Sequence, residues 1–267
     1  LTFDQDHDFH PFVRHNGQVV YSRWDYIGIN RIFLRPVMSM NPDGTSQKAI
    51  YGSNSWFPNG LYYPKELPGQ IGRFLCILAG YHASFRSGTL AVIDINKGTK
   101  EDEGFLCQIS GTGKPVEPEY RDTLTGNVWP QFMTPTPITD RVFLTSAWKK
   151  IRDRSIGIYV ADMDDNVTLL HAEEEFAILE PIPLIQRTKP PVLADRVDLE
   201  SQQATAYIQD IYYGPGLKDV PRGTIESVRV IAYDFGYIGL AGNDIIGLSG
   251  PWEAMRILGT VPVEEDG

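Results

Sequence analysis

The sequence predicts an all-β fold: a partial β-propeller of about three to four four-stranded blades, followed by a smaller β-rich, loop-rich domain. Short runs of β-branched and aromatic residues alternate with tight-turn signals, a pattern typical of successive antiparallel strands. The same order of strands and turns returns along residues 1–170, and such repetition indicates propeller blades. We therefore expect blades over residues 1–185 and a β-rich middle domain over residues 186–267.

The first copy of the repeat shows the pattern most clearly. Asn-Gly at residues 16–17 and Pro-Asp-Gly at residues 42–44 mark tight turns between apolar runs. Strands are expected at residues 6–13, 18–24, 31–34 with 38–40, and 47–51.

Two further copies follow, with loops of uneven length between them. In the second copy, strands are expected at residues 56–58, 74–79, 89–95 and 105–109. In the third, they are expected at residues 132–135, 141–146, 156–162 and 167–170. A propeller needs about four blades to close, so the pattern predicts that this chain is a piece of a longer protein with further blades.

Proline positions suggest how the copies align. Residues 180–184 (Glu-Pro-Ile-Pro-Leu) are expected to form the inner strand of an uncompleted fourth copy. Pro11, Pro58, Pro135 and Pro181 are then predicted to occupy equivalent positions in the innermost strands, where some amide groups are unpaired.

The pattern changes after residue 180. Several prolines between residues 181 and 191 indicate an extended connection, and residues 195–203 are expected to form a surface loop or short helix. Residues 204–212 and 225–233 alternate well enough to predict two strands.

Charge and cysteine content restrict the partners. With 34 acidic and 24 basic residues, the net charge of -10 argues against nucleic acid or an anionic membrane surface. No apolar run approaches the roughly 20 residues of a membrane-spanning helix. Cys76 and Cys107 belong to no Cys-x-x-Cys-His motif, so no haem site is expected in this chain. Their expected positions, on the second and fourth strands of one blade, predict two buried free thiols.

Polar residues near the inner strands form the candidate site. Asp4, Asp6, Asp8 and His10 alternate, which places them on one face of an extended chain, with His7 on the other face. Carboxylates and imidazole together can hold a divalent cation, so Asp6, His7 and Asp8 are candidate metal ligands. The structural alternative is that Asp6 and Asp8 bond backbone groups of adjacent blades and His7 packs.

Other copies are expected to add side chains to the same channel mouth. The complete set of candidate binding residues is Asp6, His7, Asp8, Ser53, Asn54, His82 and Glu180. A structural role is the alternative for His82, because a single histidine is more often structural than functional.

Several short sequence words occur in an order that resembles the hydrazine synthase alpha subunit family. They lie at residues 6–8, 40–45, 51–55, 180–184, 214–217, 220–224 and 259–267. The resemblance covers nearly the whole chain and implies TolB-type propeller blades, a middle domain and a downstream c-type haem domain in an exported, periplasmic protein. The family's middle-domain Cys-x-x-Cys-His motif is absent here, so the resemblance implies a relative without that haem.

Two functions are compatible with these observations. The first is a scaffold that positions a downstream c-type haem domain or docks partner subunits. The alternative is a metal-dependent or redox enzyme with its active site at the channel mouth, an oxidoreductase by family resemblance.

Overall fold

The computed structural model describes residues 1–2, 7–24, 35–53, 55–80, 82–83, 86–111, 119, 122–149, 155–203, 205–213, 215–234 and 254–265. Within these residues the chain is all-β, with no α-helix. It divides into two compact units, Leu1–Arg196 and Val197–Gly267. The first unit is a partial β-propeller, and the second is smaller and rich in loops, as predicted. No helix in the described part of the chain is long and apolar enough to cross a membrane.

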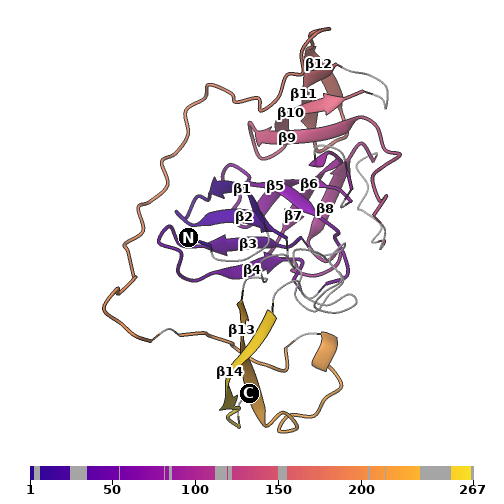
Figure 1. The fold of residues 1–267 in the computed structure, drawn as a ribbon. Coiled ribbons are helices and arrows are strands. Elements are labelled where there is room, and N and C mark those ends of the chain that lie inside the picture. The colour runs from indigo at the N-terminus through magenta and orange to yellow at the C-terminus, as the bar shows by residue number, and fades with distance from the viewer. Residues whose placement is uncertain are drawn as a thin grey trace. The chain divides into compact units, whose positions relative to one another are not determined.

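Three four-stranded antiparallel meanders form the blades (Figure 1). The first contains β1 (Asp8–Val13), β2 (Val19–Arg23), β3 (Val37–Met40) and β4 (Lys48–Tyr51). The second contains β5 (Leu61–Glu66), β6 (Arg73–Leu78), β7 (Thr89–Asp94) and β8 (Phe105–Ile109). The third contains β9 (Gln131–Pro137), β10 (Val142–Trp148), β11 (Ile156–Asp162) and β12 (Val167–His171). In each blade every strand pairs with the next one in sequence, which confirms the predicted repeat.

Turn chemistry explains the first blade. Gly17 and Gly44 have φ values of 84° and 85°, a conformation that glycine adopts without steric cost. Asn41 closes the second turn, because its carbonyl accepts a hydrogen bond from the Gly44 amide at 2.9 Å. The turn residues therefore set the strand pairing.

The first strand of the second blade is β5, at Leu61–Glu66, so the prediction of a strand at residues 56–58 is wrong. Phe57 is fully buried and packs in the core near Phe105, with ring centroids 5.4 Å apart. The Ser55 hydroxyl donates to the Phe57 carbonyl and holds this segment in a local turn. Phe57 therefore belongs to a loop and packs into the core from there, whereas the neighbouring Trp56 is exposed.

Apolar side chains fill the spaces between neighbouring blades. Val20, Val37 and Phe57 share one cluster with Phe74 and Ile93, which joins the first and second blades. A second cluster joins the second and third blades and includes Tyr62, Leu75, Val92, Phe132 and Phe143. β7 is buried at every position, because the second blade is covered on both faces. Strand β5 contacts both β1 and β9, so the first strands of the three blades lie next to one another.

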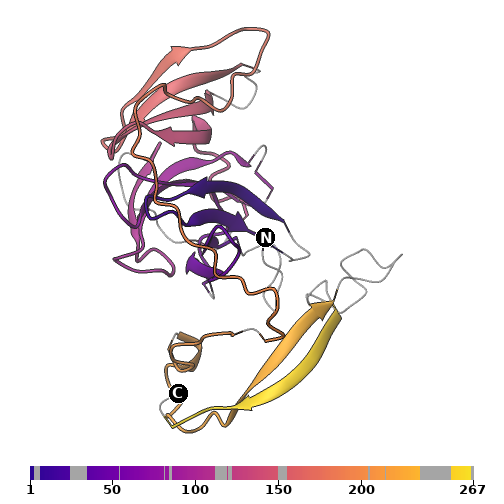
Figure 2. The ribbon, with the colours of Figure 1, turned by 90° about the vertical axis from the view of Figure 1, so that its left-hand side faces the viewer.

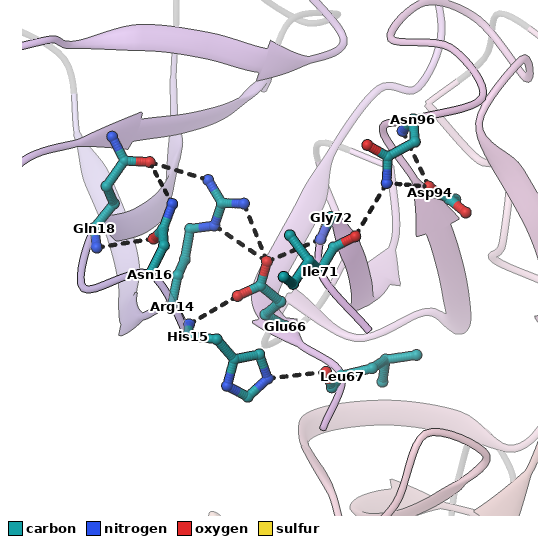
Figure 3. Close-up of polar contacts among 10 residues, drawn as sticks. All are labelled: Arg14, His15, Asn16, Gln18, Glu66, Leu67, Ile71, Gly72, Asp94 and Asn96. Atoms are coloured by element: carbon teal, nitrogen blue, oxygen red, sulfur yellow. Dashed lines mark hydrogen bonds and ion pairs between the residues drawn. The ribbon is translucent and has the colours of Figure 1, made fainter. Parts of the chain in front are cut away.

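A buried ion pair also links the first two blades (Figure 3). Glu66 Oε1 accepts hydrogen bonds from Arg14 Nη2 at 3.0 Å and from the Gly72 amide at 3.0 Å, and Oε2 accepts from the His15 amide at 2.8 Å. His15 Nε2 lies 2.9 Å from the Leu67 carbonyl oxygen. The loop after β1 is thus attached to the end of β5.

The cysteine prediction is confirmed. Cys76 lies in β6 and Cys107 in β8, the second and fourth strands of the second blade. Both are buried free thiols.

The second unit contains an antiparallel pair, β13 (Ser227–Asp234) and β14 (Ala254–Pro262), and a short 3-10 turn, η2 (Pro215–Leu217). The prediction of a strand at residues 204–212 is wrong for the residues that the structure describes there. Instead, Asp210 Oδ1 accepts from the Tyr212 amide at 2.9 Å, and the Tyr212 hydroxyl accepts from the Gly223 and Ile225 amides, both at 2.9 Å. These side-chain bonds replace the pairing that a strand would need.

Candidate ligand pocket at the inner strands

The same backbone conformation occurs in every copy of the repeat. A non-glycine residue in the left-handed conformation is followed directly by proline, and the φ values are 54°, 54°, 47° and 55° in chain order. The four pairs are His10-Pro11 in β1, Tyr63-Pro64 in β5, Thr134-Pro135 in β9 and Glu180-Pro181 after β12. The pairing register shifts at this point in β1, β5 and β9, as expected for a β-bulge. Positive φ is uncommon outside glycine and is an outlier for a β-branched residue such as Thr134.

The positions of the bulges show that the predicted proline alignment is only partly correct. Pro11 and Pro135 occupy equivalent positions, as predicted, but Pro64 holds this position in the second blade. The prediction for Pro58 is wrong, because Pro58 lies before β5 in the loop that packs into the core. Pro181 has the same backbone pair but lies in an extended segment that forms no ladder.

The four left-handed residues line one cavity of about 210 Å³. The remaining wall residues are Pro11, Lys65, Thr136 and Ile182. A bulge re-aims the side chain at its position, so the repeat brings one residue from each copy to the same place. The cavity therefore lies where the inner strands converge.

His10 and Tyr63 form one wall of the pocket. Their rings stack with centroids 3.6 Å apart and an interplanar angle of 27°. The Tyr63 amide donates to His10 Nδ1 at 3.4 Å, which assigns the proton of the neutral imidazole to Nε2. Burial, followed by the positive charges of Arg86 and Lys65, lowers the pKa of His10 to about 4, so the ring is neutral at pH 7. Burial and the Glu180 carboxylate raise the pKa of Tyr63.

Lys65, on β5, and Thr136, on β9, form another part of the wall. Lys65 Nζ donates to Thr136 Oγ1 at 2.9 Å. Burial and the positive charge of Arg187 lower the pKa of Lys65 to about 8, although Glu180 opposes this effect. The Lys65 amine is therefore mostly protonated, and so positively charged, at pH 7.

Thr134 attaches the segment after β12 to the third blade. Its hydroxyl accepts from the Glu180 amide at 3.1 Å and lies 3.2 Å from Ser146 Oγ. Further along, the Arg196 amide donates to Asp43 Oδ2 at 2.7 Å. Figure 2 shows this extended segment, in orange, passing along the blades. The segment supplies Glu180 and Ile182 to the pocket.

The residues predicted for the site lie in different places. Glu180 lines the pocket. Asp8 instead forms an ion pair with Arg23, with Oδ1 at 3.0 Å from Nε and Oδ2 at 3.3 Å from Nη2. His7 is exposed, and its ring centroid lies 5.9 Å from that of Trp24. Asp4, Asp6 and Asn54 lie outside the described residues, and Ser53 lies in the turn after β4.

His82 lies in a second cavity of about 220 Å³, away from the residues around Glu180. The Asp122 carboxylate contacts His82 Nδ1 and accepts from the His82 amide at 3.0 Å. Ser87 and Gln131 line the same cavity. The structure therefore does not bring His82 and Glu180 together in one pocket.

The described part of the chain contains no group of three or more His, Cys, Asp or Glu side chains that could hold a metal ion. Both oxygens of the Asp8 carboxylate contact Arg23. The proposed metal role of Asp6 with His7 and Asp8 stays a prediction, because Asp6 is outside the described residues.

Sequence reasoning placed His10 on the face of the aspartates but gave Tyr63, Lys65, Thr134 and Thr136 no role. The signal that identifies them is the residue before each inner-strand proline. This signal becomes visible only when Pro64 is aligned with Pro11 and Pro135.

Comparison with known proteins adds no assignment, since no protein family, curated protein or solved structure matches this chain.

Proposed function

We propose that the chain is a binding scaffold whose inner strands hold a small polar molecule. The observation that carries this proposal is the convergence of His10, Tyr63, Thr134 and Glu180 on one cavity from equivalent backbone positions. Left-handed non-glycine residues cost about 1–3 kcal/mol each, and such strain often accompanies ligand sites. A purely structural role of the bulges would explain the left-handed backbone conformation. It would not explain why the four positions carry four different polar side chains.

Pocket chemistry supports binding. The wall combines an ammonium group, hydroxyl groups, an imidazole and a carboxylate with the apolar side chains of Pro11 and Ile182. Polar groups of this kind, placed beside apolar side chains, fix the orientation of ligands in small-molecule sites. The inner strands also come from separate blades whose packed cores hold them in place.

Within a longer protein, we propose that this scaffold positions a downstream c-type haem domain or partner subunits in an exported, periplasmic protein. The resemblance of its sequence words to the hydrazine synthase alpha subunit family supports this role. The test is haem staining and the pyridine haemochrome spectrum of the full-length protein. A covalently bound haem is expected, and a full-length chain without one contradicts this part of the proposal.

Fragment binding observed by protein NMR tests the pocket itself. Neutral polar fragments, such as small amides and alcohols, are expected to shift the signals of His10 and Tyr63. Thr136→Leu narrows the cavity and should weaken this binding, whereas Thr168→Leu, on the exposed strand β12, should leave it unchanged. Shifts that are unaffected by Thr136→Leu, or that map to other residues, contradict a pocket at the inner strands.

A further inference from the structure

We propose that the pocket at the inner strands recognises a small carboxylate, with Lys65, Thr136 and His10 as its hydrogen-bond donors. This inference rests on the proposed binding function and names the chemical class of the ligand. It follows from the donors that face the cavity, from the local balance of charge and from the size of the cavity.

Lys65 supplies the positive charge. An ammonium group has three N–H donors, and within the described residues Lys65 gives one of them to Thr136 Oγ1 at 2.9 Å. Two donors are thus left for a ligand in the cavity that Lys65 lines. The hydroxyl of Thr136 accepts from Lys65 and keeps its own proton, so it adds a further donor beside the ammonium group.

His10 supplies a neutral donor. Its Nδ1 accepts from the Tyr63 amide, so Nε2 carries the proton. Stacking on Tyr63 fixes the plane of the imidazole. The donor is therefore oriented before a ligand arrives, which reduces the ordering cost of binding.

The charge around the pocket is positive, although the whole chain has a net charge of -10. Lys65 lines the cavity, and the positive charges of Arg86 and Arg187 act on His10 and Lys65 respectively. Glu180 is the single carboxylate among the lining residues. Among the described charged groups that act on His10, Tyr63 and Lys65, three are cations (Lys65, Arg86 and Arg187) and one is a carboxylate (Glu180), so a bound anion would offset positive charge. Charge-assisted hydrogen bonds from an ammonium group to a carboxylate are also stronger than neutral ones.

The cavity limits the size of the ligand. Its volume of about 210 Å³ is below the roughly 300–1,000 Å³ that is typical of pockets for drug-sized ligands. Ile182 and Pro11 offer an apolar wall beside the donors. A carboxylate with a short alkyl chain therefore fits both the size and the lining.

Butanoate and its uncharged analogue butanamide are suitable probes. Each is titrated into the wild-type chain, into Lys65→Met and into Lys48→Met, which removes an exposed lysine in β4. We expect butanoate to bind wild type and Lys48→Met equally, and Lys65→Met about tenfold or more weakly, because a hydrogen bond to a charged group is lost. Butanamide should bind all three chains weakly. NMR titration should also show a higher pKa for Lys65 and for His10 when butanoate is bound.

Glu180→Gln gives a second test that does not depend on the folding of Lys65→Met. Removal of this negative charge should tighten butanoate binding and leave butanamide unchanged. If both probes bind equally and Lys65→Met has no effect, the carboxylate inference is wrong while the pocket proposal stands. If butanoate does not bind, or binds without raising the pKa of Lys65, the carboxylate inference is also wrong. The neutral fragments then test the pocket separately.

Discussion

The carboxylate of Glu66 accepts a hydrogen bond from Arg14 Nη2 at 3.0 Å, and both side chains are buried between the first two blades. Arg14 also lies over the Phe74 ring, 5.3 Å from its centroid. The pair therefore combines charge, hydrogen bonding and packing at one junction. Its two residues lie 52 positions apart in the sequence.

Glu66→Ala is expected to destabilise the first unit strongly. The substitution leaves the Arg14 guanidinium buried without its partner, and breaking a buried pair in this way costs about 3–5 kcal/mol. Urea unfolding followed by tryptophan fluorescence measures the change. Asp164→Ala, which removes the partner of Arg141 in an exposed pair, is the control and should have little effect. Similar losses in the two variants would contradict a special role for the buried pair.

His10 should make stability depend on pH. Its folded-state pKa of about 4 lies below the ordinary value of 6.5, so the unfolded chain binds the proton more readily. The contribution of neutral His10 to the free energy of unfolding is therefore fully present above pH 6.5, and it is lost as the pH falls to about 4. We expect a loss of about 1–2 kcal/mol, because the ring is only partly buried.

His10→Asn tests this dependence, since asparagine tolerates a left-handed backbone. The variant should show a smaller difference in urea midpoint between pH 7 and pH 4.5 than the wild type does. His171→Asn replaces an exposed histidine and should retain the wild-type difference. An unchanged pH dependence in His10→Asn would assign the effect to other groups.

The two thiols should resist alkylation in the folded chain. Burial raises the pKa of Cys76 far above its ordinary value and raises that of Cys107 to about 11. At pH 8, Cys107 then has about a hundredfold less thiolate than an ordinary thiol with a pKa of 9.0. Iodoacetamide labelling followed by mass spectrometry should give no rapid adduct in the native state and two adducts in urea. Rapid native labelling of either thiol would show that its strand opens readily.

Gly80→Ala should disturb the cavity around His82. A Cβ at Gly80 would lie 1.5 Å from the Asp122 carbonyl oxygen, so the Asp122 loop would have to move. Overpacking of this kind typically costs about 1–3 kcal/mol. The melting temperature should fall, and the His82 ring signals should shift as the contact with Asp122 is lost. Gly216→Ala, where an added Cβ meets nothing within 4 Å, is the matched control.

The sequence allowed the meander of strands to be predicted because the information is local. Turn residues such as Gly17 and Gly44 and the short runs of β-branched and aromatic residues mark most strands within a few positions. The prediction for the first strand of the second blade is wrong because phenylalanine is common in strands, whereas Phe57 packs into the core from a loop. Which aromatic residue enters a ladder depends on contacts with distant parts of the chain, such as Phe105.

The candidate site was harder to predict because it depends on backbone conformation. The sequence indicated Asp8 as a candidate metal ligand but gave no sign of its ion pair with Arg23, which lies directly opposite it across β1 and β2. Lys65 and Thr136 gave no signal of their own, since they lie 71 positions apart and meet only when β5 and β9 become neighbours. Glu180 was identified because its proline repeats the pattern of the earlier copies.

Under the proposed binding function, the repeated bulge separates the residues that determine the fold from the residues that determine which ligand is bound. In the three blades the proline and the strand register hold the backbone, while the preceding residue is histidine, tyrosine or threonine; the fourth pair, Glu180-Pro181, lies outside any ladder. A protein built in this way can change what its pocket holds by single substitutions, one blade at a time, and still keep the pairing of its strands.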